Sequence, residues 1–176
     1  FTDYAGSVKG EEKSDYTFNY KADGLIVDTT TTYLYNAGYV GASLAGADGY
    51  LSKTITVRGE AGSTKQVSYY SGTESGEEVI SWSQEYNFDG SKSKTVTIYN
   101  NLDGVLQDTT VYTDKLGASL SAKPTTDLSN PAKFVKKSFT DYEGLFKGDE
   151  KANYTENFKA DGTTVDPPAG LLEFLD

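Results

Sequence analysis

Three Gly-acid-acid triplets carry the residues of this sequence whose type and spacing suit a metal ion. Their acidic pairs are Glu11 and Glu12, Glu77 and Glu78, and Asp149 and Glu150. Hard cations take carboxylate and carbonyl oxygens, so Ca²⁺ is the ion that such pairs would hold. The Asp-x-Asp-x-Asp-Gly spacing of a calcium loop does not occur, which favours a solvated acidic turn. The sequence therefore predicts no metal site and no cofactor, with Ca²⁺ at these pairs as the alternative.

Catalytic chemistry has little support in the composition. His, Cys and Met are all absent, which excludes disulfides, imidazole or thiolate metal sites and nucleophiles that need a histidine base. Two facing carboxylates could hydrolyse a glycoside. With 26 acidic residues, however, two carboxylates are expected to face each other by chance, so the sequence does not support a glycosidase. The acidic pairs also recur, whereas an active site is normally made once. We therefore predict no catalytic residues and a protein that is not an enzyme.

The charge balance bears on partners. Sixteen basic residues against 26 acidic ones give a net charge of −10. Nucleic acids and anionic membrane surfaces favour basic proteins, so we expect neither as a partner. No apolar run reaches the roughly 18 residues of a membrane helix, so we expect no membrane insertion.

The sequence repeats itself. Residues 1–28 and 139–166 are identical at 18 of 28 positions, and a weaker copy lies between them at an offset of 66. The repeats predict a first unit at 1–66, a second at 67–138 and a partial third at 139–176. The segment 115–132, which holds Pro124 and Pro131, is expected to be a linker or a loop over one end of the sheet.

Asp-Gly pairs mark the expected turns. An Asp-Gly pair between alternating segments is a strong hairpin signal, since a type I′ turn needs positive φ at both central residues. The five pairs are Asp23 and Gly24, Asp48 and Gly49, Asp89 and Gly90, Asp103 and Gly104, and Asp161 and Gly162.

Apolar and polar residues alternate on both sides of these turns, as in half-buried strands. We expect strands at 14–22, 25–35, 50–58, 64–70, 79–88, 91–100, 104–113, 133–138 and 152–160. The fold class is therefore all-β, with antiparallel hairpins or meanders in tandem repeats. An elongated repeat array and β-sandwich units both remain open.

Trp82 and the Thr runs allow two interpretations each. Trp82 could stack on a sugar ring, but its alternation with Ile80, Tyr86 and Phe88 favours the core face. The runs Thr29–Thr32 and Thr95-Val96-Thr97 could form ranks of hydroxyls that bind ice. Uneven turn spacing favours ordinary cross-strand pairing of these threonines.

The segment Tyr20-Lys21-Ala22-Asp23-Gly24, followed by Asp28-Thr29, resembles the Tyr-Asp type of hairpin repeat in large bacterial surface and toxin-shell proteins. In style, the chain resembles tandem-repeat bacterial or archaeal surface proteins of the adhesin or filament type. This resemblance implies an extracellular or cell-surface location. Because the chain begins inside a repeat and without Met, we expect a processed protein or a piece of a longer one.

These observations together predict a structural or adhesive extracellular protein that self-associates with identical repeats. A filament subunit that assembles through sheet edges is one form of that role, because an unpaired edge is a template for another strand. The apolar tail 171–175 is a candidate docking segment. The alternative function is a carbohydrate-binding β-module whose partner is a polysaccharide.

Overall fold

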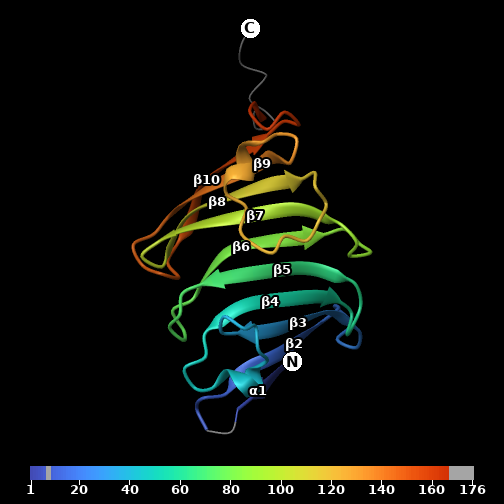
Figure 1. Cartoon of the computed structure of the whole chain (residues 1–176), viewed down its shortest axis with the longest axis vertical. Coiled ribbons are helices and arrows are strands. Elements are labelled where there is room, and N and C mark those ends of the chain that lie inside the picture. Colours follow the sequence, from blue (N-terminus) through green and yellow to red (C-terminus); the bar gives the residue numbers. More distant parts are fainter. Residues whose placement is uncertain (7–8, 167–176) are drawn as a thin grey trace. The chain divides into compact units, whose positions relative to one another are not determined.

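The computed structural model describes residues 1–6 and 9–166 of the chain, and it confirms the all-β class (Figure 1). The expected tail segment 171–175 lies outside the described residues. The chain divides into two compact units, Phe1–Lys94 and Thr95–Asp176, and each is an antiparallel meander. In the described residues no helix is long and apolar enough to cross a membrane.

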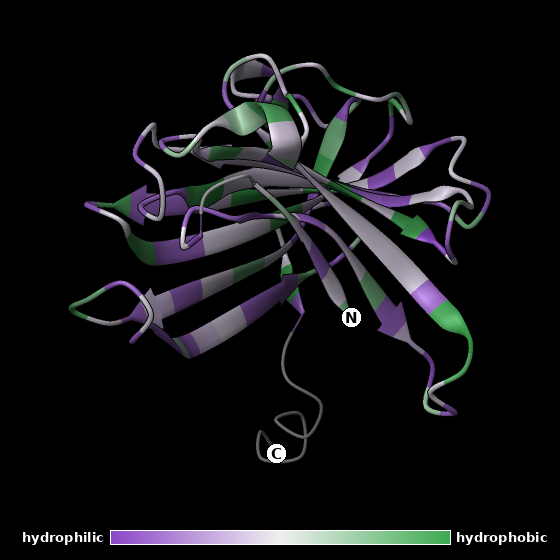
Figure 2. Ribbon diagram, turned by 90° about the horizontal axis from the view of Figure 1, so that it is seen from below, coloured by the Kyte–Doolittle hydropathy of each residue, from purple (hydrophilic) through white to green (hydrophobic). Residues whose placement is uncertain are grey.

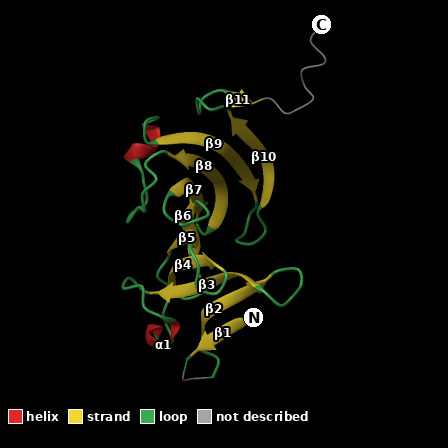
Figure 3. Ribbon diagram, turned by 90° about the vertical axis from the view of Figure 1, so that its right-hand side faces the viewer, coloured by secondary structure: helices red, strands yellow, loops and turns green. Residues whose placement is uncertain are grey.

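The first unit contains six strands that pair in sequence order (Figure 1). They are β1 (Thr2–Ala5), β2 (Lys13–Tyr20), β3 (Val27–Tyr35), β4 (Leu51–Arg58), β5 (Thr64–Ser71) and β6 (Val79–Tyr86). A one-turn helix, α1 (Ala42–Ala45), lies in the long connection between β3 and β4 and packs near β1, β2 and β3 (Figure 3). Neither α1 nor β1 was expected from the sequence.

The second unit continues with strands that again pair with their sequence neighbours. They are β7 (Ser93–Leu102), β8 (Val105–Asp114), β9 (Phe134–Glu143), β10 (Lys151–Phe158) and β11 (Val165–Asp166), with a 3₁₀ turn, η1 (Thr126–Ser129), before β9. The expected strand at 133–138 is too short, because β9 extends through residues 139–143, which repeat the sequence of β1.

The strands show that the first two sequence repeats are sets of four, β1–β4 and β5–β8, and that the third begins with β9, β10 and β11. β1, β5 and β9 occupy the first position, and β2, β6 and β10 the second. A β-bulge in the second strand recurs at the same place, where Asp15, Ser81 and Asn153 are each the one extra residue of the register shift. These residues are separated by the same offsets, 66 and 138, as the sequence repeats. The geometry therefore repeats with the sequence.

Hydroxyl pairs link neighbouring strands across the sheet. Thr31 Oγ1 lies 2.9 Å from Thr56 Oγ1 between β3 and β4. Thr2 and Thr17 pair at 3.0 Å in the first repeat, and Thr140 and Thr155 pair at 2.9 Å in the third. Bands of hydrophilic and hydrophobic residues alternate along the strands (Figure 2). Thr31 belongs to the run Thr29–Thr32, so this run takes part in cross-strand pairing, as its β-propensity favoured.

The segment between β8 and β9 is an ordered loop held to the start of β9. Lys115 donates its backbone N–H to the Lys133 carbonyl at 2.9 Å, and Lys133 Nζ lies 2.7 Å from Asp127 Oδ1. The Phe134 N–H is bonded to the Asn130 carbonyl, and the Phe134 side chain is buried. Of the two expected forms, a loop at the end of the sheet describes this segment.

The Asp-Gly turns differ from the expected type I′ geometry at four of five pairs, although three of those four still lie in the turn between consecutive strands. Only Asp103 and Gly104 both have positive φ, 51° and 83°, as a type I′ turn requires. At Gly24, Gly90 and Gly162 the glycine alone has positive φ, and the Asp before each accepts backbone N–H groups of the following residues. These three turns are longer, because Lys21, Asn87 and Lys159 each close them by a bond to the residue five positions on.

Asp48 and Gly49 do not form a hairpin turn. They follow α1 at the end of the connection 36–50, and Gly49 donates its N–H to the Gly46 carbonyl. A Cβ on Gly49 would come within 2.6 Å of the Ala45 carbonyl oxygen. The glycine is therefore required by the close approach of backbone rather than by a two-residue turn.

Gly90 and Gly24 offer a matched pair of substitutions. Their φ values are +75° and +69°, so alanine is strained by about 1 kcal/mol at either position. A Cβ on Gly90 would also lie 2.9 Å from the Thr64 backbone nitrogen, whereas nothing lies within 4 Å at Gly24. We expect Gly90→Ala to lower the free energy of unfolding by about 2–3 kcal/mol and Gly24→Ala by about 1 kcal/mol. Urea denaturation measures both, and equal losses would contradict the clash at Thr64.

Candidate functional site

The acidic triplets close their own turns. In each triplet the second carboxylate accepts the backbone N–H of the glycine two residues before it. Gly10 donates to Glu12 Oε2 at 2.7 Å, Gly76 to Glu78 Oε2 at 2.9 Å, and Gly148 to Glu150 Oε2 at 2.7 Å. Because one oxygen of each is bound to backbone, these carboxylates serve as turn acceptors.

Two of these carboxylates also accept a backbone N–H from the last strand of the preceding repeat. Glu78 Oε1 accepts the N–H of Leu51 in β4 at 2.7 Å, and Glu150 Oε1 accepts the N–H of Leu106 in β8 at 3.0 Å. This bond from Leu106 is the main reason that the pKa of Glu150 lies below its usual value. The two leucines are equivalent, since each stands two residues after an Asp-Gly glycine. A glutamate of one repeat thus holds the last strand of the repeat before it.

The first acids of the triplets, Glu11, Glu77 and Asp149, are exposed. In the part of the chain that the structure describes, no group of three acidic side chains comes close enough to hold a metal ion. The six candidate metal ligands therefore lie as three separate pairs, one in each turn. The second acid of each pair, Glu12, Glu78 or Glu150, has a structural role as a turn acceptor. Calcium binding at these pairs stays a hypothesis.

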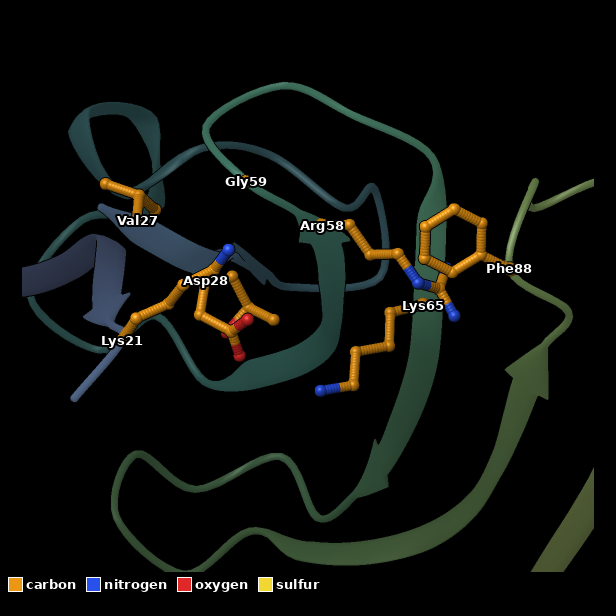
Figure 4. A pocket seen from close by; sticks show the side chains of 8 residues that line it. Lys21, Val27, Asp28, Arg58, Gly59, Lys65 and Phe88 are labelled. Atoms are coloured by element: carbon orange, nitrogen blue, oxygen red, sulfur yellow. The ribbon is translucent and has the colours of Figure 1, made fainter. Parts of the chain in front are cut away.

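Cationic side chains surround a shallow hollow in the first unit. It has a volume of about 320 Å³, and Arg58 and Lys65 line it beside Phe88 (Figure 4). The Arg58 guanidinium lies 5.3 Å from the centre of the Phe88 ring and donates to the carbonyls of Thr64 and Tyr86. Phe88 itself is 84% exposed. The remaining lining residues are Lys21, Val27, Asp28, Thr29 and Gly59.

A similar hollow of about 350 Å³ occurs in the second unit. Lys136 Nζ lies 4.2 Å from the centre of the Phe158 ring, and Lys115, Lys137 and Lys159 line the same hollow. Lys137 is the repeat equivalent of Lys65, because the second and third repeats are offset by 72. An anionic group would be attracted to either hollow, although the chain as a whole has a net charge of −10. Sequence reasoning missed both hollows, although the shared position of Lys65 and Lys137 was a signal for them.

Comparison with protein-family models, with curated proteins and with solved structures finds no match to this chain. The function must therefore be inferred from the geometry described above.

Trp82 does not form an exposed aromatic platform. Its side chain is 4% exposed and stacks on Tyr69 with the ring centres 4.2 Å apart and the planes nearly parallel. The prediction that Trp82 and Tyr86 lie in the core is confirmed, since Tyr86 is 8% exposed. The same prediction is wrong for Phe88, which follows the end of β6 and points into solvent beside Arg58.

Proposed function

We propose that this chain is a non-enzymatic structural segment of an extracellular or cell-surface protein, built from four-strand repeats that join edge to edge. The observation that carries the proposal is the repeated junction between repeats. β4 pairs with β5 and β8 pairs with β9 through long antiparallel ladders, and a glutamate from the later repeat binds the earlier one at both junctions. A junction that is built twice suits a chain of repeats better than a single active site.

The interior of the sheet supports a mechanical role. Many of its buried side chains are hydroxyl-bearing, among them Thr30, Ser68, Ser83 and Thr110. Thr30 donates its hydroxyl to the Gly59 carbonyl at 2.7 Å, which ties β3 to the turn after β4. Paired threonines and continuous ladders resist the sliding of one strand past the next. The acidic surface keeps such a chain soluble through charge repulsion.

A second candidate function is the binding of an anionic polysaccharide. The two lysine-rich hollows with their phenylalanine rings favour it, because a ring can contact a sugar face while ammonium groups attract carboxylates. Trp82 does not contribute, since it is buried.

Sedimentation velocity of the purified chain tests both functions. A structural segment is expected to form larger species as the protein concentration rises, in the absence of any polysaccharide. A binding module is expected to stay monomeric and to form larger species only when a carboxylated polysaccharide such as alginate is added. A chain that remains monomeric at every concentration, without and with alginate, would contradict both. Electron micrographs that show fibres would add support to the structural role.

A further inference from the structure

The strand β1 has an outer edge, and the equivalent edges of β5 and β9 pair with another strand. β5 pairs with β4 on one side and β6 on the other, and β9 pairs with β8 and β10. Within the residues that the structure describes, β1 pairs with β2 alone. Phe1 exchanges backbone hydrogen bonds with Phe18 in β2, so the backbone groups of the next residue, Thr2, point away from β2.

The sequence and geometry of β1 match those of β9. Residues 1–5 and 139–143 differ only at the last position, and the bulge that follows is shared. The hydroxyl pair of Thr2 and Thr17 recurs as the pair of Thr140 and Thr155. An edge that is equivalent in both backbone and side chains is expected to accept the same kind of strand as β9 does, which is β8.

Glu12 has a carboxylate oxygen equivalent to the one with which Glu78 and Glu150 accept a leucine N–H. Its Oε2 holds the Gly10 N–H, as Oε2 of Glu78 and Glu150 holds the corresponding glycine. At the other two glutamates, Oε1 accepts the leucine N–H of the preceding repeat's last strand. Among the described residues, no hydrogen bond reaches Oε1 of Glu12. A carboxylate oxygen therefore stands where an arriving strand would present its leucine N–H.

We propose that the outer edge of β1 and Glu12 together bind a fourth strand of the Asp-Gly-x-Leu type from another copy of this repeat. That strand must have one unpaired edge, unlike β4 and β8, which are each paired on both sides. The register is that of β8 on β9, which places Thr109 of the arriving strand opposite Thr2 and the Leu106 N–H on Glu12 Oε1. This inference rests on the proposed structural function and gives that function its partner and its register.

The register places one unfavourable pair at the junction. Asp108 of the arriving strand stands opposite Asp3, as it stands opposite Asp141 in β9. In β4 the equivalent position is occupied by Lys53, which faces Tyr69. Like charges that face each other across a ladder weaken the pairing, and opposite charges strengthen it. A lysine in place of Asp108 is therefore expected to tighten binding at β1.

The test uses the full chain and a synthetic, fluorescently labelled peptide with the sequence of residues 103–114. Fluorescence anisotropy is expected to show saturable binding of this peptide. N-methylation of the peptide at Leu106 removes the donated N–H, and Glu12→Ala in the chain removes the acceptor. Each change should weaken binding by about tenfold or more, as is usual for a hydrogen bond to a charged group. Glu11→Ala makes the same charge change one residue away and should leave binding unaltered.

The Asp108→Lys peptide tests the register and should bind more tightly than the parent peptide. The inference is overturned if the peptide does not bind saturably, if Glu12→Ala and Glu11→Ala act alike, or if N-methylation of Leu106 has no effect. Failure of the proposed function would be seen differently, as a chain that stays monomeric in sedimentation without any peptide. A chain that assembles but ignores the peptide would remove this inference alone.

Discussion

Replacement of Trp82 by alanine is expected to lower the free energy of unfolding of the first unit by about 3–5 kcal/mol. The indole is 4% exposed and lies flat on Tyr69, 4.2 Å between ring centres, so its removal leaves a cavity over that ring. Tyr69 also receives Lys53 Nζ at 5.1 Å from its ring centre, so the loss extends to a cation–π contact. Urea denaturation followed by far-ultraviolet circular dichroism measures the effect, because the variant has no tryptophan for fluorescence.

Trp82→Phe is the matched control. A phenyl ring keeps part of the stacking on Tyr69 and fills part of the volume, so we expect a loss clearly smaller than that of alanine. Val165, which is 43% exposed, provides a surface control at which Val165→Ala should change stability by less than about 0.5 kcal/mol. If Trp82→Ala behaved like the surface control, Trp82 would not be part of the core, and the exposed-platform interpretation would return.

The strands were predictable, but the faces of the strands were not, because β-bulges interrupt the two-residue period. In β6, Trp82 pairs with Tyr69 and Ile80 pairs with Tyr70, with Ser81 extra between them. Since paired residues share a face and Tyr69 and Tyr70 face opposite sides, Ile80 and Trp82 lie on opposite faces. Simple alternation had placed them together. A bulge adds one residue without a composition signal, so a single sequence does not reveal it.

The turns, like the strands, were predictable in part. The position of each Asp-Gly pair was visible in the sequence, but the turn type depends on how many residues the strands leave unpaired. Asp103 and Gly104 form a two-residue turn because Leu102 and Val105 pair directly. At Asp161 the loop is longer, and the carboxylate accepts the Thr164 hydroxyl and the Thr163 and Thr164 N–H groups. The bond from the Thr164 side chain is the main cause that lowers the pKa of Asp161 to about 2.

The role of the acidic triplets could not be predicted, for a different reason. The bond from Leu106 to Glu150 joins residues 44 positions apart, and the bond from Leu51 to Glu78 joins residues 27 positions apart. Local patterns showed that the triplets recur with the repeat, which was correct. Only the register of β4 and β8 on the following strand brings the leucine N–H to the carboxylate.

Replacement of Phe134 by alanine is expected to cause a comparable loss in the second unit, about 3–5 kcal/mol. Phe134 is 2% exposed at the start of β9. It lines two hollows that the loop between β8 and β9 also lines, one with Leu128 and Pro131 and the other with Leu120 and Pro124. The loop therefore closes over this one ring, and alanine would leave the loop with little apolar surface to contact.

Hydrogen exchange distinguishes this result from a uniform loss of stability. In Phe134→Ala, exchange should quicken most at the Lys115, Lys133 and Phe134 amides, whose backbone bonds hold the loop to β9. Phe146→Ala is the matched control, because Phe146 is 68% exposed in the turn after β9, and it should change stability by less than about 0.5 kcal/mol. Equal losses from the two variants, or a loop whose amides exchange as slowly in Phe134→Ala as in the parent, would show that the loop does not depend on Phe134. The segment 115–132 would then be a linker that is not packed on the sheet. The boundary between the second and third repeats would not depend on a packed loop.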